Sequence, residues 1–294
     1  MPHAKASDGI KLHYEEAGSG IPLLFVHEFA GDYRSWEPQM RFFARRYRCI
    51  TYSQRGYTPS DVPTTPDAYS YEHFRDDVLA VLDHLKIDKA HICGLSMGGY
   101  SALLVGLKYP QRALSLTLAG AGSGSERWLT EDFRKHSRAV AQEFETRGAI
   151  EVSKTYGTSQ ARIPFLVKDP RGFGEFQQQL GQHSAQGSAH TSRGFQGARP
   201  SLYDFEAEMT RLAVPTLIIV GDEDEPCLEP SLFFKQSIPA SGLAMFPKTG
   251  HVVNLEEPAL FNETLGDFLA RVDAGRWPAR DPRSIRTGAP KLPR

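Results

Sequence analysis

The chain has 294 residues, of which 40% are hydrophobic and 23% are charged, and its formal net charge at pH 7 is −1. This balance is ordinary for a globular protein and supports a large core, so we expect one core domain with an inserted segment. A net charge near zero favours neither nucleic acid nor an anionic membrane as a partner.

The three cysteines, Cys49, Cys93 and Cys227, form no C-x-x-C pair and no metal-ligand spacing. We therefore expect buried free thiols in a reducing compartment, with no metal and no cofactor. The N-terminus lacks the apolar segment of a signal peptide, and no stretch approaches the ~20 apolar residues of a membrane span. These features predict a cytoplasmic protein that acts on a small molecule, and they leave a homodimer open.

The first part of the chain alternates between predicted strands and helices. Asp8-Gly9 predicts a turn before a strand of alternating polarity. The continuous apolar run 22–26 is typical of a strand inside a parallel sheet, and it leads into the loop His27-Glu28-Phe29. The periodicity then predicts a helix over 34–47, a strand over 48–52 and a helix over 71–85.

A G-x-S-x-G pentapeptide, Gly94 to Gly98, lies between a predicted strand over 90–93 and a predicted helix that ends at Pro110. Ser96 would sit on the sharp turn, with glycines beside it because a Cβ there would crowd the neighbouring strand or helix. The Met97 amide would lie at a helix N-terminus, where a developing negative charge is favoured. Alone, the pentapeptide also fits a common turn without chemistry. A serine nucleophile needs a base, and the base needs an acid that orients it, so partners must be found elsewhere in the chain.

The pattern changes in the second half of the chain. After a predicted strand over 112–119, strands vanish from about 123 to 208, and helical stretches take their place at 128–146, 149–156, 172–180 and 183–197. Further on, the buried strand 215–220 ends in an acidic loop, and the strand 243–246 ends at Thr249-Gly250-His251. Helices are predicted over 228–237 and 256–272.

The strand, G-x-S-x-G turn and helix, followed by the acidic loop and then the Gly-His loop, resemble the α/β-hydrolase superfamily over nearly the whole chain. The resemblance implies an α/β fold, with a mostly parallel eight-stranded sheet flanked by helices. It implies a core made of 1–122 and 208–294, with 123–207 inserted as a helical cap over the active site. The Pro/Arg-rich residues 275–294 read as a tail within the core range, on the surface or on a neighbouring subunit.

Site residues follow from the same resemblance. Ser96 would be the nucleophile and His251 the base, and the backbone N–H groups of Phe29 and Met97 would form the oxyanion hole. The family's acid most often lies three residues after the glycine that ends the strand. That spacing selects Asp224 and leaves Asp222 as the fallback.

Glu28 departs from the family, which usually carries glycine at that position. We expect its carboxylate to point away from Ser96 and fix the loop, the alternative being a solvated surface acid. If it faced the site, it would disfavour anionic substrates. Other expectations are an architectural Arg55, packing roles for His183 and His190, and pocket or loop roles for His27, Trp128, Phe165 and Phe173.

Serine at position 96 argues against the haloalkane dehalogenases and most epoxide hydrolases of this fold, which carry aspartate there. We expect a serine hydrolase that cleaves a small to medium carboxylic ester or lactone through an acyl-enzyme. One alternative is a hydrolase of carbon–carbon bonds in ring-fission diketones. Another is a ligand-binding relative that turns over slowly or not at all.

Overall fold

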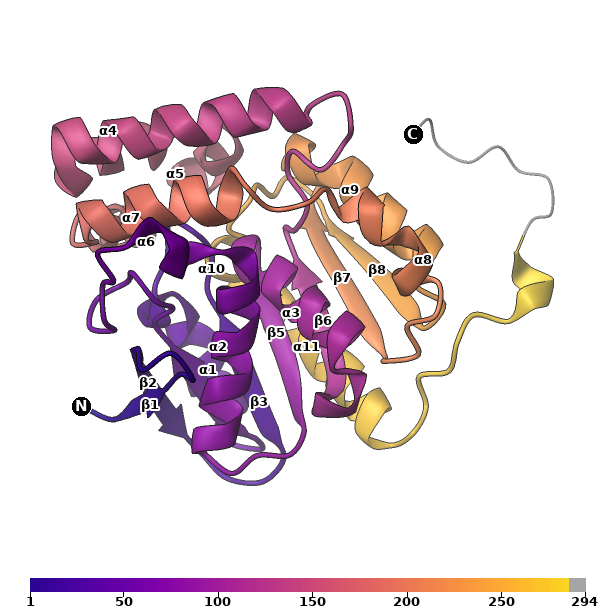
Figure 1. Cartoon of the computed structure of the whole chain (residues 1–294). Helices are drawn as coiled ribbons and strands as arrows, with labels where there is room; N and C mark the ends of the chain where they lie inside the picture. Colours follow the sequence, from indigo (N-terminus) through magenta and orange to yellow (C-terminus); the bar gives the residue numbers. More distant parts are fainter. Residues whose placement is uncertain (286–294) are drawn as a thin grey trace.

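A single sheet runs through the centre of the molecule (Figure 1), and the computed structural model describes residues 1–285. Within that range the sheet has eight strands in the order β1-β2-β4-β3-β5-β6-β7-β8. β2 pairs antiparallel with both β1 and β4, and the remaining neighbours pair parallel. The strands are β1 (His3–Lys5), β2 (Lys11–Ala17), β3 (Pro22–Val26), β4 (Arg48–Tyr52), β5 (Ala90–Leu95), β6 (Ala113–Ala119), β7 (Thr216–Gly221) and β8 (Ser241–Phe246). The predicted mostly parallel, eight-stranded sheet is confirmed.

The central strands are covered on both faces. β5 and β7 are buried at every position, which is why their sequences are continuous apolar runs. The register pairs Leu95 with Ala119 and Gly221 with Phe246, so these parallel strands end together at one edge of the sheet. The loops that follow β3, β5, β7 and β8 therefore meet at that edge, where α/β sheets commonly bind ligands.

Helices cover the sheet on both sides (Figure 1). α2 (Tyr71–His84) packs on α3 (Met97–Lys108), and α1 (Glu37–Phe43) packs on α11 (Pro258–Asp273). The helix predicted over 34–47 is shorter than expected. A 3₁₀ turn, Tyr33–Trp36, comes first, and α1 then begins at Glu37, with Pro38 in its first turn, and ends at Phe43. The remaining core helices are α8 (Glu206–Met209), α9 (Glu225–Ser237) and α10 (Val253–Glu256).

The segment between β6 and β7 contains helices and no strand, as the sequence predicts. Besides α8, which lies just before β7, it contains α4 (Thr130–Tyr156), α5 (Ile163–Lys168), α6 (Pro170–Leu180), α7 (Ala185–Thr191) and a π-helical segment, Ser192–Gln196. Gly148, with φ 77°, interrupts α4 and separates the two helical stretches predicted there. These helices lie across the carboxyl edge of the sheet (Figure 1). The limits 123–207 for a cap stay a prediction.

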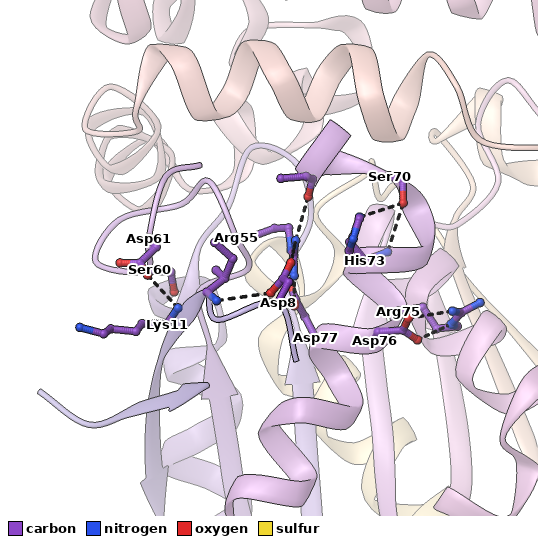
Figure 2. A network of polar contacts seen from close by, with 12 residues as sticks. Asp8, Lys11, Arg55, Ser60, Asp61, Ser70, His73, Arg75, Asp76 and Asp77 are labelled. Carbon is purple, nitrogen blue, oxygen red and sulfur yellow. Dashed lines mark hydrogen bonds and ion pairs between the residues drawn. The ribbon is translucent and has the colours of Figure 1, made fainter. Parts of the chain in front are cut away.

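Arg55 has the architectural role expected of it, in a buried polar network (Figure 2). Its Nε and Nη2 donate to the Asp77 carboxylate at 2.7 and 2.6 Å. Its Nη1 donates to Asp8 at 2.7 Å and to the Ala68 carbonyl at 2.9 Å. The guanidinium thus ties the N-terminal turn to α2 and to the loop before it.

The described start of the C-terminal tail is held against the core. The Trp277 indole donates to the Ala240 carbonyl at 2.9 Å, and its ring lies edge-on to Phe268. The rest of the tail predicted for 275–294 lies outside the described residues, which end at Ile285. All three cysteines are buried and free, as expected. Among residues 1–285, no helix combines the length and apolar character that crossing a membrane requires.

Candidate active site

Ser96 lies on the sharp turn that the pentapeptide predicts, between β5 and α3. Its φ of 53° and ψ of −111° are strained for a residue with a Cβ, at a cost of about 1–3 kcal/mol. A Cβ on Gly94 would lie 2.2 Å from the Gly98 carbonyl oxygen, and one on Gly98 would lie 2.1 Å from that of Val26. Only glycine fits at both places, so the turn can press against β3 and raise the Ser96 side chain above the sheet edge.

His251 and Asp224 come from the loops after β8 and β7, and they meet. The Nδ1–H of His251 donates to Oδ2 of Asp224 at 2.8 Å, and both side chains are buried. The fallback acid, Asp222, accepts the backbone N–H of Thr249 at 3.2 Å instead. Asp224, and not Asp222, therefore hydrogen-bonds the imidazole, and it does so through Nδ1 and not through Nε2.

The pKa of His251 is raised above its ordinary 6.5. Burial alone would lower the pKa, but the charge and hydrogen bond of Asp224 outweigh it. Arg162 lowers the pKa, and Glu28 raises it. The net effect favours the protonated imidazole, which is the form that a general base reaches in the transition state.

Hydrogen bonds fix the loop after β3, which contains His27, Glu28 and Phe29. Nε2 of His27 accepts the Gln54 backbone N–H at 3.0 Å, so Nδ1 carries the proton and donates to the Glu28 carbonyl at 2.7 Å. Burial lowers the pKa of His27 to about 4, so this side chain is neutral. The Tyr57 hydroxyl donates to the Phe29 carbonyl at 3.0 Å. His27 is thus a loop residue rather than a pocket residue.

The two predicted oxyanion donors follow neighbouring strands, β3 and β5, at this edge of the sheet. Met97 is the first residue of α3, so its N–H has no partner within the helix. Phe29 follows β3, and its side chain lines the same cavity as Ser96. Donation by their two N–H groups to an oxyanion stays a prediction.

Glu28 differs from both expectations. Its side chain is only about 1% exposed, which excludes a solvated surface acid, and it forms an ion pair with Arg162. Its Oε2 also lies 3.8 Å from Nε2 of His251, so the carboxylate borders the imidazole rather than turning away from the site. Arg162 comes from the 3₁₀ turn Gln160–Arg162 of the inserted segment and was not singled out in the sequence. No local pattern links two residues 134 positions apart.

One cavity brings the candidate residues together, with a volume of about 480 Å³. Ser96, Asp224 and His251 all line it. The inserted segment supplies most of the remaining wall, including Phe133, Val140, Tyr156, Arg162 and Arg199. This volume suits a small to medium ligand.

Three predicted pocket residues lie elsewhere. Trp128 is 53% exposed and precedes α4 on the solvent side. Phe165 and Phe173 pack against each other, at 5.8 Å between ring centroids, and against Phe176. None of the three lines the cavity that holds Ser96, because an apolar side chain in a layer of helices can face the neighbouring helix as well as the cavity.

His183 and His190 have the packing roles expected of them. The His183 ring lies 5.1 Å from that of Tyr57, and the His190 ring lies 5.1 Å from that of Tyr69. Burial lowers the pKa of His183 to about 4. Neither histidine lines the cavity that holds Ser96.

Asp224, Cys227 and His251 place possible metal-ligand atoms within 4.8 Å of one another. Asp224 and His251 already share a hydrogen bond. Burial raises the pKa of Cys227 well above its ordinary value, and the protonated thiol donates to the Gly120 carbonyl at 3.2 Å. These contacts fit a hydrogen-bonded pair beside a buried thiol better than a metal centre, which needs a thiolate.

Residues 21–258 match the sequence model of the alpha/beta hydrolase fold family, and the chain belongs to that family. It is 28% identical over 251 residues to a 3-oxoadipate enol-lactonase of Acinetobacter baylyi, covering 85% of this chain and 89% of the relative. It is 27% identical over 274 residues to a 2-hydroxymuconate semialdehyde hydrolase of Pseudomonas sp. strain CF600, covering 90% and 93%.

A similar solved structure is that of a thermophilic esterase from Thermogutta terrifontis. It superposes with a TM-score of 0.82 at 25% identity, covering 92% of this chain and 98% of the esterase. The family match confirms the resemblance inferred from the motifs.

Proposed function

We propose that this protein is a serine hydrolase that cleaves a small to medium carboxylic ester or lactone through an acyl-enzyme. Ser96 would be the nucleophile, His251 the general base and Asp224 the acid that orients it. The observation that carries the proposal is the convergence of a strained Ser96 and a buried His251–Asp224 pair in one cavity of about 480 Å³.

The first half of the reaction uses the free Nε2 of His251. Nε2 takes the Ser96 proton as Oγ attacks the carbonyl carbon, and Asp224 and Glu28 stabilise the imidazolium that forms. The Phe29 and Met97 amides would donate to the oxygen that becomes negative. When the tetrahedral intermediate collapses, Nε2–H gives its proton to the leaving alkoxide.

The second half repeats the sequence with water. Nε2 takes a proton from water, the hydroxide attacks the acyl carbon, and Ser96 leaves with the proton returned from His251. In a lactone the alcohol and acid parts stay in one molecule, so ring opening leaves the whole substrate attached to Ser96 until this step.

The relatives support the ester and lactone class without deciding it. An enol-lactonase and an esterase are among the similar proteins, which favours hydrolysis at a carboxylic ester bond. The similar 2-hydroxymuconate semialdehyde hydrolase supports carbon–carbon bond hydrolysis as the second candidate. A ligand-binding relative that turns over slowly or not at all is the third.

Turnover of short p-nitrophenyl esters tests the proposal. Wild-type protein should hydrolyse them, and Ser96→Ala should lower kcat by about 10³-fold or more, because no other group replaces the nucleophile. Fast cleavage of a ring-fission diketone with slow ester hydrolysis would favour the second candidate. Tight ligand binding without turnover would favour the third.

We also propose that the protein acts in the cytoplasm on a small molecule, without nucleic acid or membrane partners and without a cofactor. The balanced charge supports this, as does a mechanism that uses only the chain's own groups. A homodimer is the assembly that we propose to test by light scattering, which should give twice the monomer mass.

A further inference from the structure

Two arginines line the cavity that holds Ser96, and they differ in their partners. Arg162 is ion-paired with Glu28. Arg199 is 7% exposed, and among residues 1–285 no carboxylate oxygen lies within 4 Å of its guanidinium nitrogens. Its Nη2 donates to the Ser123 carbonyl at 2.7 Å.

Arg199 is held by aromatic rings rather than by an acid. Its guanidinium lies 4.8 Å from the ring centroid of Tyr100 and 5.0 Å from that of Phe133. Tyr100 is on α3, one turn after Ser96, and its hydroxyl donates to the Pro200 carbonyl at 3.0 Å. The Ser201 hydroxyl donates to the Ser125 carbonyl. The charge is therefore fixed in place on a loop anchored to the same helix that follows Ser96.

The other charges of the cavity wall are compensated. Asp224 is paired with His251, and Glu143 is paired with Arg147 on the half-exposed side of α4. Burial lowers the pKa of Arg199 from its ordinary value, because no nearby anion offsets the loss of water. A buried cation without an anion is unfavourable unless a ligand supplies the missing charge.

We propose that Arg199 binds a carboxylate of the substrate, so that the natural substrate is an ester or lactone that carries a second, ionised carboxyl group. This inference rests on the proposed function and names its substrate class. The guanidinium keeps donors that the Ser123 carbonyl does not use, and a planar carboxylate is the anion that fits such donors. The prediction that Glu28 disfavours anionic substrates is not expected to hold, because Arg162 neutralises that carboxylate.

Two esters with the same leaving group and acyl chains of similar length test the proposal. They are p-nitrophenyl butyrate, which is neutral, and the p-nitrophenyl monoester of glutaric acid, which carries a free carboxylate. Wild-type kcat/KM should favour the anionic ester. Arg199→Gln should lower kcat/KM for that ester by about 10- to 100-fold, mainly through KM, as expected for a hydrogen bond between charged groups.

In Arg199→Gln, kcat/KM for the anionic ester should fall much further than kcat/KM for the neutral ester, so the ratio of the two esters is the readout. Arg199→Lys should keep part of the anionic preference, because it keeps the charge. Arg193→Gln is the matched control, since Arg193 is a partly exposed arginine of the same segment that pairs with Glu145. It should leave the ratio of the two esters unchanged.

A measurement on wild-type protein covers the case in which Arg199→Gln does not fold. Glutarate should inhibit hydrolysis of the neutral ester competitively, at concentrations at least about tenfold below those of glutaramide, the uncharged diamide. Equal inhibition by the two, or equal kcat/KM for the two esters, would overturn the proposal and leave the serine hydrolase intact.

If the wild type hydrolyses neither ester, the proposed function fails, and calorimetry decides the Arg199 inference separately. Binding of glutarate by wild-type protein that is lost in Arg199→Gln would support it. Absence of binding to the wild type would overturn it.

Discussion

The acidic loop after β7 contains several carboxylates, and their hydrogen-bond partners show which one contacts His251. Oδ2 of Asp224 accepts from His251, whereas Asp222 accepts a backbone N–H. Asp224→Asn should lower kcat by about 10³- to 10⁴-fold, because an amide favours the wrong imidazole tautomer. Asp222→Asn keeps an oxygen for the Thr249 amide and should change kcat less than about threefold. Near-normal kcat in Asp224→Asn, measured on a neutral ester, would remove Asp224 from the mechanism.

The raised pKa of His251 sets the acid side of the pH profile. The base must lose its proton before it can accept one from Ser96, so kcat/KM should rise with pH through a pKa above 6.5. The contribution of His251 to folding stability has the opposite pH dependence. Since folding raises this pKa, the stabilisation from the protonated ring is complete below pH 6.5 and disappears as pH rises through the folded value. A kcat/KM profile that is already flat below pH 6 would contradict this prediction.

Glu28 also affects the His251 imidazole, because its carboxylate lies 3.8 Å from Nε2, whereas Asp224 contacts Nδ1. Glu28→Gln removes a charge that raises the pKa of His251, and it leaves the opposing charge of Arg162 unpaired. The acid limb of kcat/KM should therefore move to lower pH. The variant should also lose about 3–5 kcal/mol of stability, because a buried cation loses its partner. Denaturant unfolding checks the stability, and an acid limb that moves upward would contradict the assigned role.

At the scale of elements, the tight contact between the Ser96 turn and β3 can be tested with a methyl group. In Gly98→Ala the new Cβ would lie 2.1 Å from the Val26 carbonyl oxygen, so the turn or the strand must move, at a cost of about 3 kcal/mol or more. Gly174→Ala is the matched control. Gly174 lies in α6 with nothing near its Cβ position, and alanine there should stabilise by about 0.5–1 kcal/mol.

Thermal unfolding and ester turnover measure both glycine variants. Loss of stability and activity in Gly98→Ala, with neither lost in Gly174→Ala, is the expected outcome. Equal melting temperatures for Gly98→Ala and wild type would mean that the turn does not press on β3 as described.

Elements with a strong local signal could be predicted from the sequence. The strand, turn and helix around Ser96 have a distinct sequence pattern, and Gly148 marks the break in α4. The short helix α5 was missed because six residues with a proline at the start carry no measurable periodicity. Cap side chains such as Phe165 could not be assigned, because a helix between two apolar surfaces presents similar residues to both.

At the scale of the whole molecule, topology explains what the motifs could locate. Parallel strands that end at one edge carry Ser96, Asp224 and His251 to the same cavity, so their meeting could be expected from strand order alone. The charges around them could not be expected in the same way. The Glu28–Arg162 pair, and an Arg199 without a carboxylate partner in the described part of the chain, depend on how the inserted helices pack on the sheet. No spacing rule in one sequence encodes that packing.

Reaction with a fluorophosphonate probe, followed by mass mapping of the modified peptide, tests the central claim most directly. The probe reacts with a serine only where a base and an oxyanion site activate it. We predict a single adduct on Ser96 that is absent from Ser96→Ala and strongly slowed in His251→Ala. An unlabelled protein, or an adduct on another serine with Ser96 untouched, would contradict the account.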